Sequence, residues 1–364
     1  MAKKVVIVGG VAAGASAAAR LRRLDEDTQI VMVERGEYIS FANCGLPYYV
    51  GGVIERRESL LIQTPRSMFR RFNIDVRNNS EVEEIIPQNK EVVIRNNLDG
   101  NVYNENYDYL VLCPGASPIV PNIPGADQPN VFTVRNVPDS DRIKHYIEMY
   151  QPQHAVVIGG GFIGLEMAEM LYELNLRVSI VEAADQLLGS LDPEMAAIVH
   201  SYLRSRDFEI HLQAQALSME GAERVEKITL ASGKSIPADL VIMGVGVRPE
   251  VGLAAQAGLA IGSTGGIQVD DYLRTSDPSI YAAGDAIQVT DFVTGQATLI
   301  PLASPANRQG WLVANNICGR AMKYTGAQGT SIVKIMDLTA AVTGKNEKSL
   351  QKLGIPYKSV HGLP

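Results

Sequence analysis

The sequence contains few cysteines and no long apolar segment. Its 364 residues include three cysteines, Cys44, Cys113 and Cys318, which are widely separated and odd in number. This pattern excludes a disulfide framework and does not match the spacing of a zinc site, so we expect no metal. No apolar run approaches the roughly 20 residues of a membrane-spanning helix. Met1–Lys4 leads directly into an apolar strand, without the apolar core and cleavage site of a signal peptide. We therefore expect a cytoplasmic protein that does not enter a membrane.

Positive charge is also in short supply. The chain has 33 Lys and Arg residues against 40 Asp and Glu residues, which gives a net charge of −7. This balance argues against a general nucleic-acid-binding protein. The length is sufficient for two or three domains with substantial cores.

The N-terminal region has the pattern of a dinucleotide-binding βαβ unit. An apolar strand over residues 3–8 leads into Gly9-Gly10-Val11-Ala12-Ala13-Gly14, an alanine-rich helix follows, and a second strand over residues 29–33 ends in Glu34. The glycine turn and helix N-terminus suit a pyrophosphate, and the carboxylate suits ribose hydroxyls. Val11 stands where the strict fingerprint has its central glycine, so this match is imperfect.

A second unit of the same kind begins about 150 residues later. The strand Ala155–Ile158 leads into Gly159-Gly160-Gly161-Phe162-Ile163-Gly164, a complete G-x-G-x-x-G. A helix over residues 165–174, a strand over residues 177–181 and Glu182 follow in the expected order. Glu182 favours NADH over NADPH, because a carboxylate repels a 2′-phosphate.

A second internal repeat supports two nucleotide-binding folds. Asp108–Val111 runs to Gly115 and Pro118, and Asp239–Ile242 runs to Gly246 and Pro249, with identical spacing. Each of the two segments predicts a strand that comes late in the chain order of its own sheet and ends in a glycine turn. Six prolines between positions 114 and 138 predict an extended connection between the halves.

Beyond the second fold, the pattern predicts strands over residues 267–269 and near 280, a helix over residues 305–320 and strands within residues 331–342. The strand expected near residue 280 runs into Tyr281-Ala282-Ala283-Gly284-Asp285. Together with the two glycine fingerprints, this segment resembles the FAD- and NAD(P)H-dependent disulfide oxidoreductases over essentially the whole chain.

The resemblance implies an α/β fold of two Rossmann-like domains, the second inserted in the first, plus an incomplete α+β dimerisation domain. We expect an FAD-binding domain over residues 1–121 and 267–323, an NAD(P)H-binding domain over residues 122–266, and the start of the interface domain over residues 324–364. Relatives continue with an interface domain that completes a homodimer, and some add a rhodanese-like module. If residue 364 is the true end, we expect impaired dimerisation and reduced activity.

Ser40-Phe41-Ala42-Asn43-Cys44-Gly45-Leu46-Pro47 narrows the resemblance. It places a cysteine at the expected start of a helix, where the helix dipole favours a thiolate. Most free cysteines are simply packed in a core, which is our interpretation of Cys113 and Cys318. Tyr49 stands five residues after Cys44, so the C-x₄-C pair of glutathione reductase is absent. The octapeptide and the Gly-Gly-Val-Ala opening resemble the coenzyme A-disulfide reductases and NADH-dependent persulfide reductases, as do residues 292–296, 301–309 and 343–348.

With one active cysteine, the electron acceptor must be an external sulfur compound bound to Cys44. We expect electrons to pass from NAD(P)H through FAD to a Cys44 mixed disulfide or persulfide of coenzyme A or another small thiol. One alternative is an NADH oxidase or peroxidase with a Cys44 sulfenic acid. The peroxidase type has a histidine where this chain has Ala12. Another alternative is an FAD- and NADH-binding redox sensor.

The resemblance also assigns residues to each ligand. Ser40 and Asn43 are expected beside the Cys44 nucleophile, and Arg20, Arg23 and Arg71 at the phosphates of coenzyme A. For NAD(P)H the expected residues are Gly159, Gly161, Phe162, Ile163, Gly164, Glu166, Glu182 and Gly246. For FAD they are Gly9, Gly10, Val11, Ala12, Ala13, Gly14, Glu34, Arg35, Val82, Pro114, Gly115, Arg135, Gly284, Asp285, Pro301 and Ala303.

Overall fold

The computed structural model describes residues 2–362, which form two compact units. Unit 1 consists of the described residues of Met1–Ala42, Leu61–Ser117 and Arg248–Gly329. Unit 2 consists of those of Asn43–Leu60, Pro118–Val247 and Thr330–Pro364. The chain crosses between the units within β8 (Ala116–Pro118) and β17 (Val247–Pro249), and also on either side of residues 43–60.

Unit 1 is built around a parallel sheet in the order β18-β7-β1-β2-β3. In its central strand, β1 (Lys4–Val8), the residues Val5, Val6 and Ile7 are fully buried, as expected for a strand with neighbours on both sides. Helix α1 (Ala12–Leu24) packs closely on α8 (Ala303–Ile317), since a Cβ on Gly310 would lie 2.1 Å from the Ala13 carbonyl oxygen. The other strands are β2 (Gln29–Val33), β3 (Asp75–Arg77), β7 (Tyr109–Leu112) and β18 (Ile280–Ala282).

An antiparallel sheet, β4-β5-β6, completes the core of unit 1. Val92 and Ile94 of its central strand are fully buried. The strands of this sheet are β4 (Ser80–Ile86), β5 (Glu91–Asn96) and β6 (Val102–Asn106). Unit 1 also contains α3 (Pro65–Phe72), α7 (Gly252–Gln256), β19 (Val289–Thr290) and β20 (Ala297–Thr298).

Unit 2 repeats this plan. Its parallel sheet has the order β12-β11-β10-β16-β9, and its antiparallel sheet is β13-β14-β15. The parallel strands are β9 (Val131–Phe132), β10 (His154–Ile158), β11 (Arg177–Val181), β12 (Glu209–His211) and β16 (Leu240–Met243). The antiparallel strands are β13 (Ala216–Glu220), β14 (Lys227–Leu230) and β15 (Ser235–Pro237). Helix α5 (Phe162–Glu173) occupies the place of α1.

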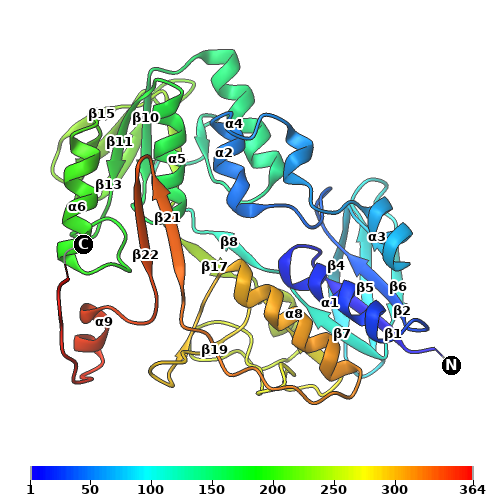
Figure 1. The fold of residues 1–364 in the computed structure, drawn as a ribbon. Coiled ribbons are helices and arrows are strands. Elements are labelled where there is room, and N and C mark those ends of the chain that lie inside the picture. The colour runs from blue at the N-terminus through cyan, green and yellow to red at the C-terminus, as the bar shows by residue number, and fades with distance from the viewer. Residues whose placement is uncertain (1, 363–364) are drawn as a thin grey trace. The chain divides into compact units, whose positions relative to one another are not determined.

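Unit 2 also carries a hairpin and several helices. The hairpin of β21 (Ser331–Ile335) and β22 (Leu338–Val342) lies beside α5 (Figure 1). The remaining elements are the 3-10 helices η1 (Asn43–Gly45) and η2 (Arg57–Leu60) and the α-helices α2 (Leu46–Val50), α4 (Val137–Tyr150), α6 (Pro193–Arg204) and α9 (Glu347–Lys352).

The sheet orders confirm the expected α/β fold with two Rossmann-like units. The expected domain boundaries remain a prediction. Two local expectations were wrong. Residues 267–269 were expected to form a strand, but they form only isolated bridges at Ile267. The proline-rich segment was expected to be an extended connection, but it contains β8 and β9, and β9 extends the parallel sheet of unit 2. Proline is tolerated at such short edge strands, so its frequency did not reveal them.

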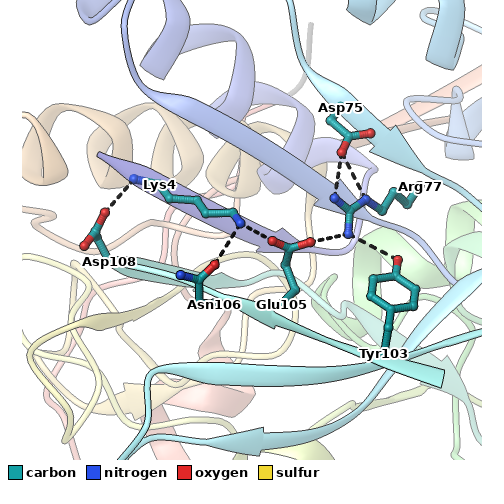
Figure 2. A network of polar contacts seen from close by, with 7 residues as sticks. All are labelled: Lys4, Asp75, Arg77, Tyr103, Glu105, Asn106 and Asp108. Carbon is teal, nitrogen blue, oxygen red and sulfur yellow. Dashed lines mark hydrogen bonds and ion pairs between the residues drawn. The ribbon is translucent and has the colours of Figure 1, made fainter. Parts of the chain in front are cut away.

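A polar network ties the two sheets of unit 1 together (Figure 2). The Glu105 carboxylate on β6, of which 11% is exposed, is paired with Lys4 of β1 and Arg77 of β3. Arg77 also donates to Asp75 at 2.8 Å and to the Tyr103 hydroxyl at 3.2 Å. Burial raises the pKa of Glu105, but the hydrogen bonds from Lys4 and Arg77 outweigh it and hold that pKa below its usual value.

Replacing Glu105 by Gln should therefore destabilise the protein. The variant leaves two cations near an uncharged amide, and we expect a loss of about 2 kcal/mol in the free energy of unfolding. Urea unfolding at neutral pH measures it. Glu83→Gln is the matched control, since its partner Arg95 is 44% exposed and such pairs contribute little. Because the folded pKa of Glu105 is depressed, the wild-type advantage should shrink as the pH falls through that pKa. An equal loss in both variants would contradict the role of the network.

Candidate functional site

The first glycine loop brings α1 against the end of β1. Gly9 has φ +94°, and a Cβ there would lie 2.1 Å from the Cys113 carbonyl oxygen. A Cβ on Gly14 would lie 1.9 Å from the Gly9 carbonyl oxygen. Val11 is the N-cap of α1 and makes no side-chain cap bond. The unpaired N–H groups and positive dipole end of this 13-residue helix make its N-terminus a suitable site for a phosphate.

The carboxylate of Glu34 is tied to this loop. It accepts hydrogen bonds from the backbone N–H of Gly10 and of Gly36, each at 2.9 Å. The sequence predicted that the Glu34 carboxylate accepts hydrogen bonds from the ribose hydroxyls of a dinucleotide. The structure shows that Glu34 also shapes the loop, and each oxygen retains a lone pair for a ligand. Its neighbour Arg35 is paired with Glu250 at 3.4 Å.

Asp285 lies on the turn after β18, next to the start of α1. Its neighbour Gly284 has φ +88°, and a Cβ there would lie 3.3 Å from the Ala13 side chain. Gln309 of α8, 1% exposed, accepts from the Gly284 N–H at 2.7 Å, a support that the sequence did not indicate. Burial raises the pKa of Asp285 to about 6, and its carboxylate has no hydrogen-bond partner among residues 2–362.

These features fit a bound dinucleotide such as FAD. The glycine cradle leaves no room for side chains at Gly9 and Gly14, and the half-buried Asp285 offers a free acceptor beside it. The other expected FAD residues of unit 1 are Val82 on β4, Pro114 and Gly115 after β7, and Pro301 and Ala303 at the start of α8. Arg135 lies in unit 2, where its N–H donates to Asp139 at 2.9 Å.

The second glycine loop has the same geometry in unit 2. A Cβ on Gly159 would lie 2.3 Å from the Gly244 carbonyl oxygen, and one on Gly164 would lie 2.0 Å from the Gly159 carbonyl oxygen. Glu182 accepts from the N–H of Gly160 at 2.6 Å and of Ala184 at 2.7 Å, as Glu34 does in unit 1. The remaining expected residues are Gly161, Phe162, Ile163 and Glu166, at the start of α5, and Gly246 between β16 and β17.

Cys44 is exposed in η1, just before α2. Helix α2 is held against α4 and α5: a Cβ on Gly51 would lie 2.6 Å from the Met170 sulfur, and Arg57 donates to both oxygens of Asp141 at 3.0 and 2.6 Å. Asn43 is exposed beside Cys44. Ser40 lies in unit 1 in the left-handed region, φ +44°, where its N–H donates to Gly10 at 2.8 Å.

The surroundings of Cys44 differ from the helix-dipole environment that the sequence suggested, and the expected thiolate remains a prediction. Although the Cys44 side chain reaches solvent, the protein around it partly desolvates the thiol and so raises its pKa, and the charge of Glu166 raises that pKa further. Cys44 also precedes a helix of only five residues, whose end provides little positive potential. The sequence could not show that the charge of Glu166, 122 positions away, acts on this cysteine. Burial likewise raises the pKa of Cys113 and Cys318, both partly buried, as expected for packed thiols.

The three expected coenzyme A arginines lie in unit 1, each against an aromatic ring. The Arg20 guanidinium lies 4.8 Å from the ring centre of Trp311 and donates to Asn315 at 3.2 Å. Arg23 and Arg71 lie 5.5 and 5.3 Å from the Phe72 ring. The sequence gave no signal for the ring contacts of Arg20 and Arg23, since α1 is distant in the chain from α8 and α3.

Comparison with known proteins identifies relatives. A family model described as pyridine nucleotide-disulphide oxidoreductase matches residues 3–310. The NAD(P)H sulfur oxidoreductase (CoA-dependent) of Pyrococcus furiosus is 39% identical over 358 residues, 98% of this chain and 79% of the relative. The coenzyme A disulfide reductase of Staphylococcus haemolyticus is 33% identical over 343 residues, 94% of this chain and 76% of the relative.

Among solved structures, reduced CoADR-RHD of Bacillus anthracis matches with a TM-score of 0.97 and 53% identity. The match covers 98% of this chain and 64% of that protein, so the chain spans less than two thirds of that relative. The family model and the extensive identity to curated relatives agree with the two glycine loops. The chain belongs to the pyridine nucleotide-disulphide oxidoreductase family.

Proposed function

We propose that this protein uses the electrons of NAD(P)H to reduce coenzyme A disulfide, or a persulfide or polysulfide of coenzyme A or another small thiol, at Cys44. The observation that carries the proposal is the single exposed thiol at the start of α2, with Tyr49 where a paired cysteine would stand. An acceptor sulfur must then come from outside the chain. The relatives named for sulfur oxidoreduction and coenzyme A disulfide reduction support this substrate class.

The sulfur chemistry at Cys44 balances as follows. The Cys44 thiolate attacks one sulfur of the disulfide, a new S–S bond forms to Cys44, and the other half leaves as a thiolate that takes up a proton. FAD, when bound, would pass the hydride equivalent of NAD(P)H to the Cys44-bound sulfur. The sum is one NAD(P)H, one proton and one disulfide converted to NAD(P)⁺ and two thiols. One proton must therefore be taken up from solvent in each catalytic cycle.

The glycine loops assign the two nucleotides. The loop of unit 1, with Glu34 and Asp285, would hold FAD, and the loop of unit 2 would hold the nicotinamide cofactor. Glu182 supports NADH as the better donor, because a carboxylate next to the second glycine loop would repel a 2′-phosphate. Arg20, Arg23 and Arg71 are the proposed contacts for the phosphates of coenzyme A.

We also propose that the full-length protein forms a homodimer. We propose a cytoplasmic location, because the reducing cytoplasm keeps free thiols such as the three of this chain reduced. Within residues 2–362 the structure contains no helix long and apolar enough to span a membrane.

Anaerobic reoxidation of the NADH-reduced holoenzyme tests the function. The reduced protein is mixed separately with coenzyme A disulfide, coenzyme A persulfide and O₂, and the return of the flavin absorbance is followed. We expect one of the sulfur compounds to react at least about tenfold faster than O₂, because only a sulfur compound can form an S–S bond to Cys44. Fastest oxidation by O₂ would favour an NADH oxidase instead. Slow oxidation by all three would favour a redox sensor.

A further inference from the structure

The segment of residues 343–348 lies outside both glycine loops, although it resembles the same subgroup of disulfide reductases. Its Asn346 is the N-cap of α9 and is 9% exposed. The side-chain amide of Asn346 donates to the carbonyl oxygen of Gly189 at 3.1 Å and to that of Leu191 at 3.2 Å. Asn346 therefore joins the start of α9 to the loop that follows β11, 155 positions earlier in the chain.

This loop, residues 186–192 and here named the 186–192 loop, has two further buried supports within unit 2. The Gln186 side chain, 5% exposed, donates to the carbonyl oxygen of Leu191 at 3.0 Å and to that of Leu188 at 3.3 Å. His200 of α6, 8% exposed, accepts from the Leu187 N–H at 3.0 Å through its Nε2 atom. Because these polar side chains are buried and bind the main chain of the loop, they fix its path.

The 186–192 loop in turn holds Gly160 in the second glycine loop. The Leu188 N–H donates to the Gly160 carbonyl oxygen at 2.8 Å, and a Cβ on Gly160 would lie 2.3 Å from the Leu187 side chain. Glu182 holds the N–H of the same glycine at 2.6 Å. Gly160 belongs to the turn between β10 and the N-terminus of α5, so its position decides where the N–H groups of that turn lie.

The 186–192 loop also contains a strained residue. Leu188 has φ +48°, in the left-handed region, which a bulky side chain seldom adopts. Such a conformation persists only where the surrounding structure enforces it, and it recurs at functional sites. The last residue of the loop is held as well, since the Glu347 N–H donates to Asp192 at 2.8 Å. Removing a support should therefore let the loop relax away from Gly160.

We propose that Asn346 and His200 are positioning residues for the nicotinamide cofactor. They hold the 186–192 loop against Gly160, and the loop keeps the second glycine turn in the shape that binds a pyrophosphate. Each acts through the loop, Asn346 from the segment after the β21–β22 hairpin and His200 from α6. The proposal rests on the assignment of the nicotinamide cofactor to unit 2, made under the proposed function.

Binding of NAD⁺ to the oxidised, FAD-loaded protein tests the role of Asn346 without any turnover. Asn346→Ser keeps an N-cap for α9 and loses the amide that reaches the loop. We expect its dissociation constant for NAD⁺, measured by calorimetric titration, to rise about tenfold, because two buried hydrogen bonds to the loop are lost. Asn136→Ser is the matched control. Asn136 is the N-cap of α4 in the same unit, where it accepts from Asp139, and this variant should bind NAD⁺ as wild type does.

Two substitutions at His200 separate the hydrogen bond from the packing of the ring. His200→Leu leaves the N–H of the fully buried Leu187 without an acceptor, and we expect the dissociation constant for NAD⁺ to rise about tenfold. His200→Gln offers an amide oxygen at a similar reach, so its affinity should return to within about threefold of wild type. His145→Leu, at an exposed histidine of α4, should bind as wild type does.

Reduction of the bound flavin by NADH gives a second readout, which needs no sulfur acceptor. In Asn346→Ser and His200→Leu, the NADH concentration for half-maximal reduction rate should rise by the same factor as the dissociation constant. The rate at saturating NADH should stay within about twofold of wild type, since the lost interaction affects binding alone. FAD content should stay at wild-type level, because FAD is assigned to the other glycine loop.

Three results would overturn the proposal. The first is NAD⁺ affinity of Asn346→Ser and His200→Leu equal to that of their controls. The second is loss of FAD in parallel with NAD⁺, which would indicate general unfolding; His200→Gln and Asn346→Ser, the milder changes, decide the question if His200→Leu does not fold. The third is a wild type that retains FAD but does not bind NAD⁺, which would also refute the cofactor assignment of the proposed function. Tight wild-type binding with unaltered variants would refute the positioning role alone.

Discussion

Replacing Cys44 by serine is expected to lower the kcat for coenzyme A disulfide and persulfide by at least about 1,000-fold. A serine hydroxyl is not ionised at neutral pH and forms no S–S bond, so the acceptor sulfur cannot become attached to the chain. The exposed position in η1 makes the change in the free energy of unfolding small, within about 0.5 kcal/mol. FAD content and bleaching of the flavin by NADH should stay at wild-type level. Steady-state turnover with each acceptor and absorbance spectra of the purified variant measure these effects.

Cys318→Ser is the matched control for this prediction. Cys318 follows the last turn of α8 in unit 1, where it is partly buried, and its loss should leave turnover unchanged. Full disulfide turnover by Cys44→Ser would show that the acceptor is reduced without a covalent adduct. Equal losses in both variants would point to a general effect of removing thiols.

The two nucleotide-binding folds were predictable because their signals are local. Each consists of a short apolar strand, a glycine turn, a helix and a second strand ending in an acid, within about 30 residues. The equal spacing from Asp108 to Pro118 and from Asp239 to Pro249 revealed the matching late strands. The structure confirms that β7 and β16 pair with β1 and β10 in the same manner.

The environment of Cys44 was not predictable because it depends on contacts between distant segments. Local sequence suggested that a helix dipole lowers the pKa of the thiol, whereas partial desolvation and the charge of Glu166 raise that pKa. Chain order also suggested that Cys44 belongs with the first glycine loop, yet residues 43–60 pack on α4 and α5 of unit 2. Packing of this kind joins segments far apart in the chain, such as those of Arg57 and Asp141, which are 84 positions apart, and no pattern within either segment encodes it.

Replacing Gly14 by alanine should prevent FAD binding and destabilise the protein. The new Cβ would lie 1.9 Å from the Gly9 carbonyl oxygen, so α1 must move away from the end of β1 or the glycine turn must open. Either movement displaces the N–H groups that would meet the pyrophosphate. We expect less than about a tenth of the wild-type FAD content, and a loss of about 3 kcal/mol in the free energy of unfolding. Flavin absorbance per mole of purified protein and urea unfolding measure the two effects.

Two further alanine variants separate the local clash from a general effect of glycine substitution. Gly252, the first residue of α7 in unit 1, has open space around its Cβ position, so alanine there should be neutral or slightly stabilising. Gly164 is the counterpart of Gly14 in unit 2, with its Cβ position 2.0 Å from the Gly159 carbonyl oxygen. Because the clash lies in the other glycine loop, Gly164→Ala should retain FAD and lose NADH binding, measured by NADH titration of the flavin-loaded protein. Loss of FAD from Gly164→Ala, or full FAD content in Gly14→Ala, would contradict the assignment of one nucleotide to each loop.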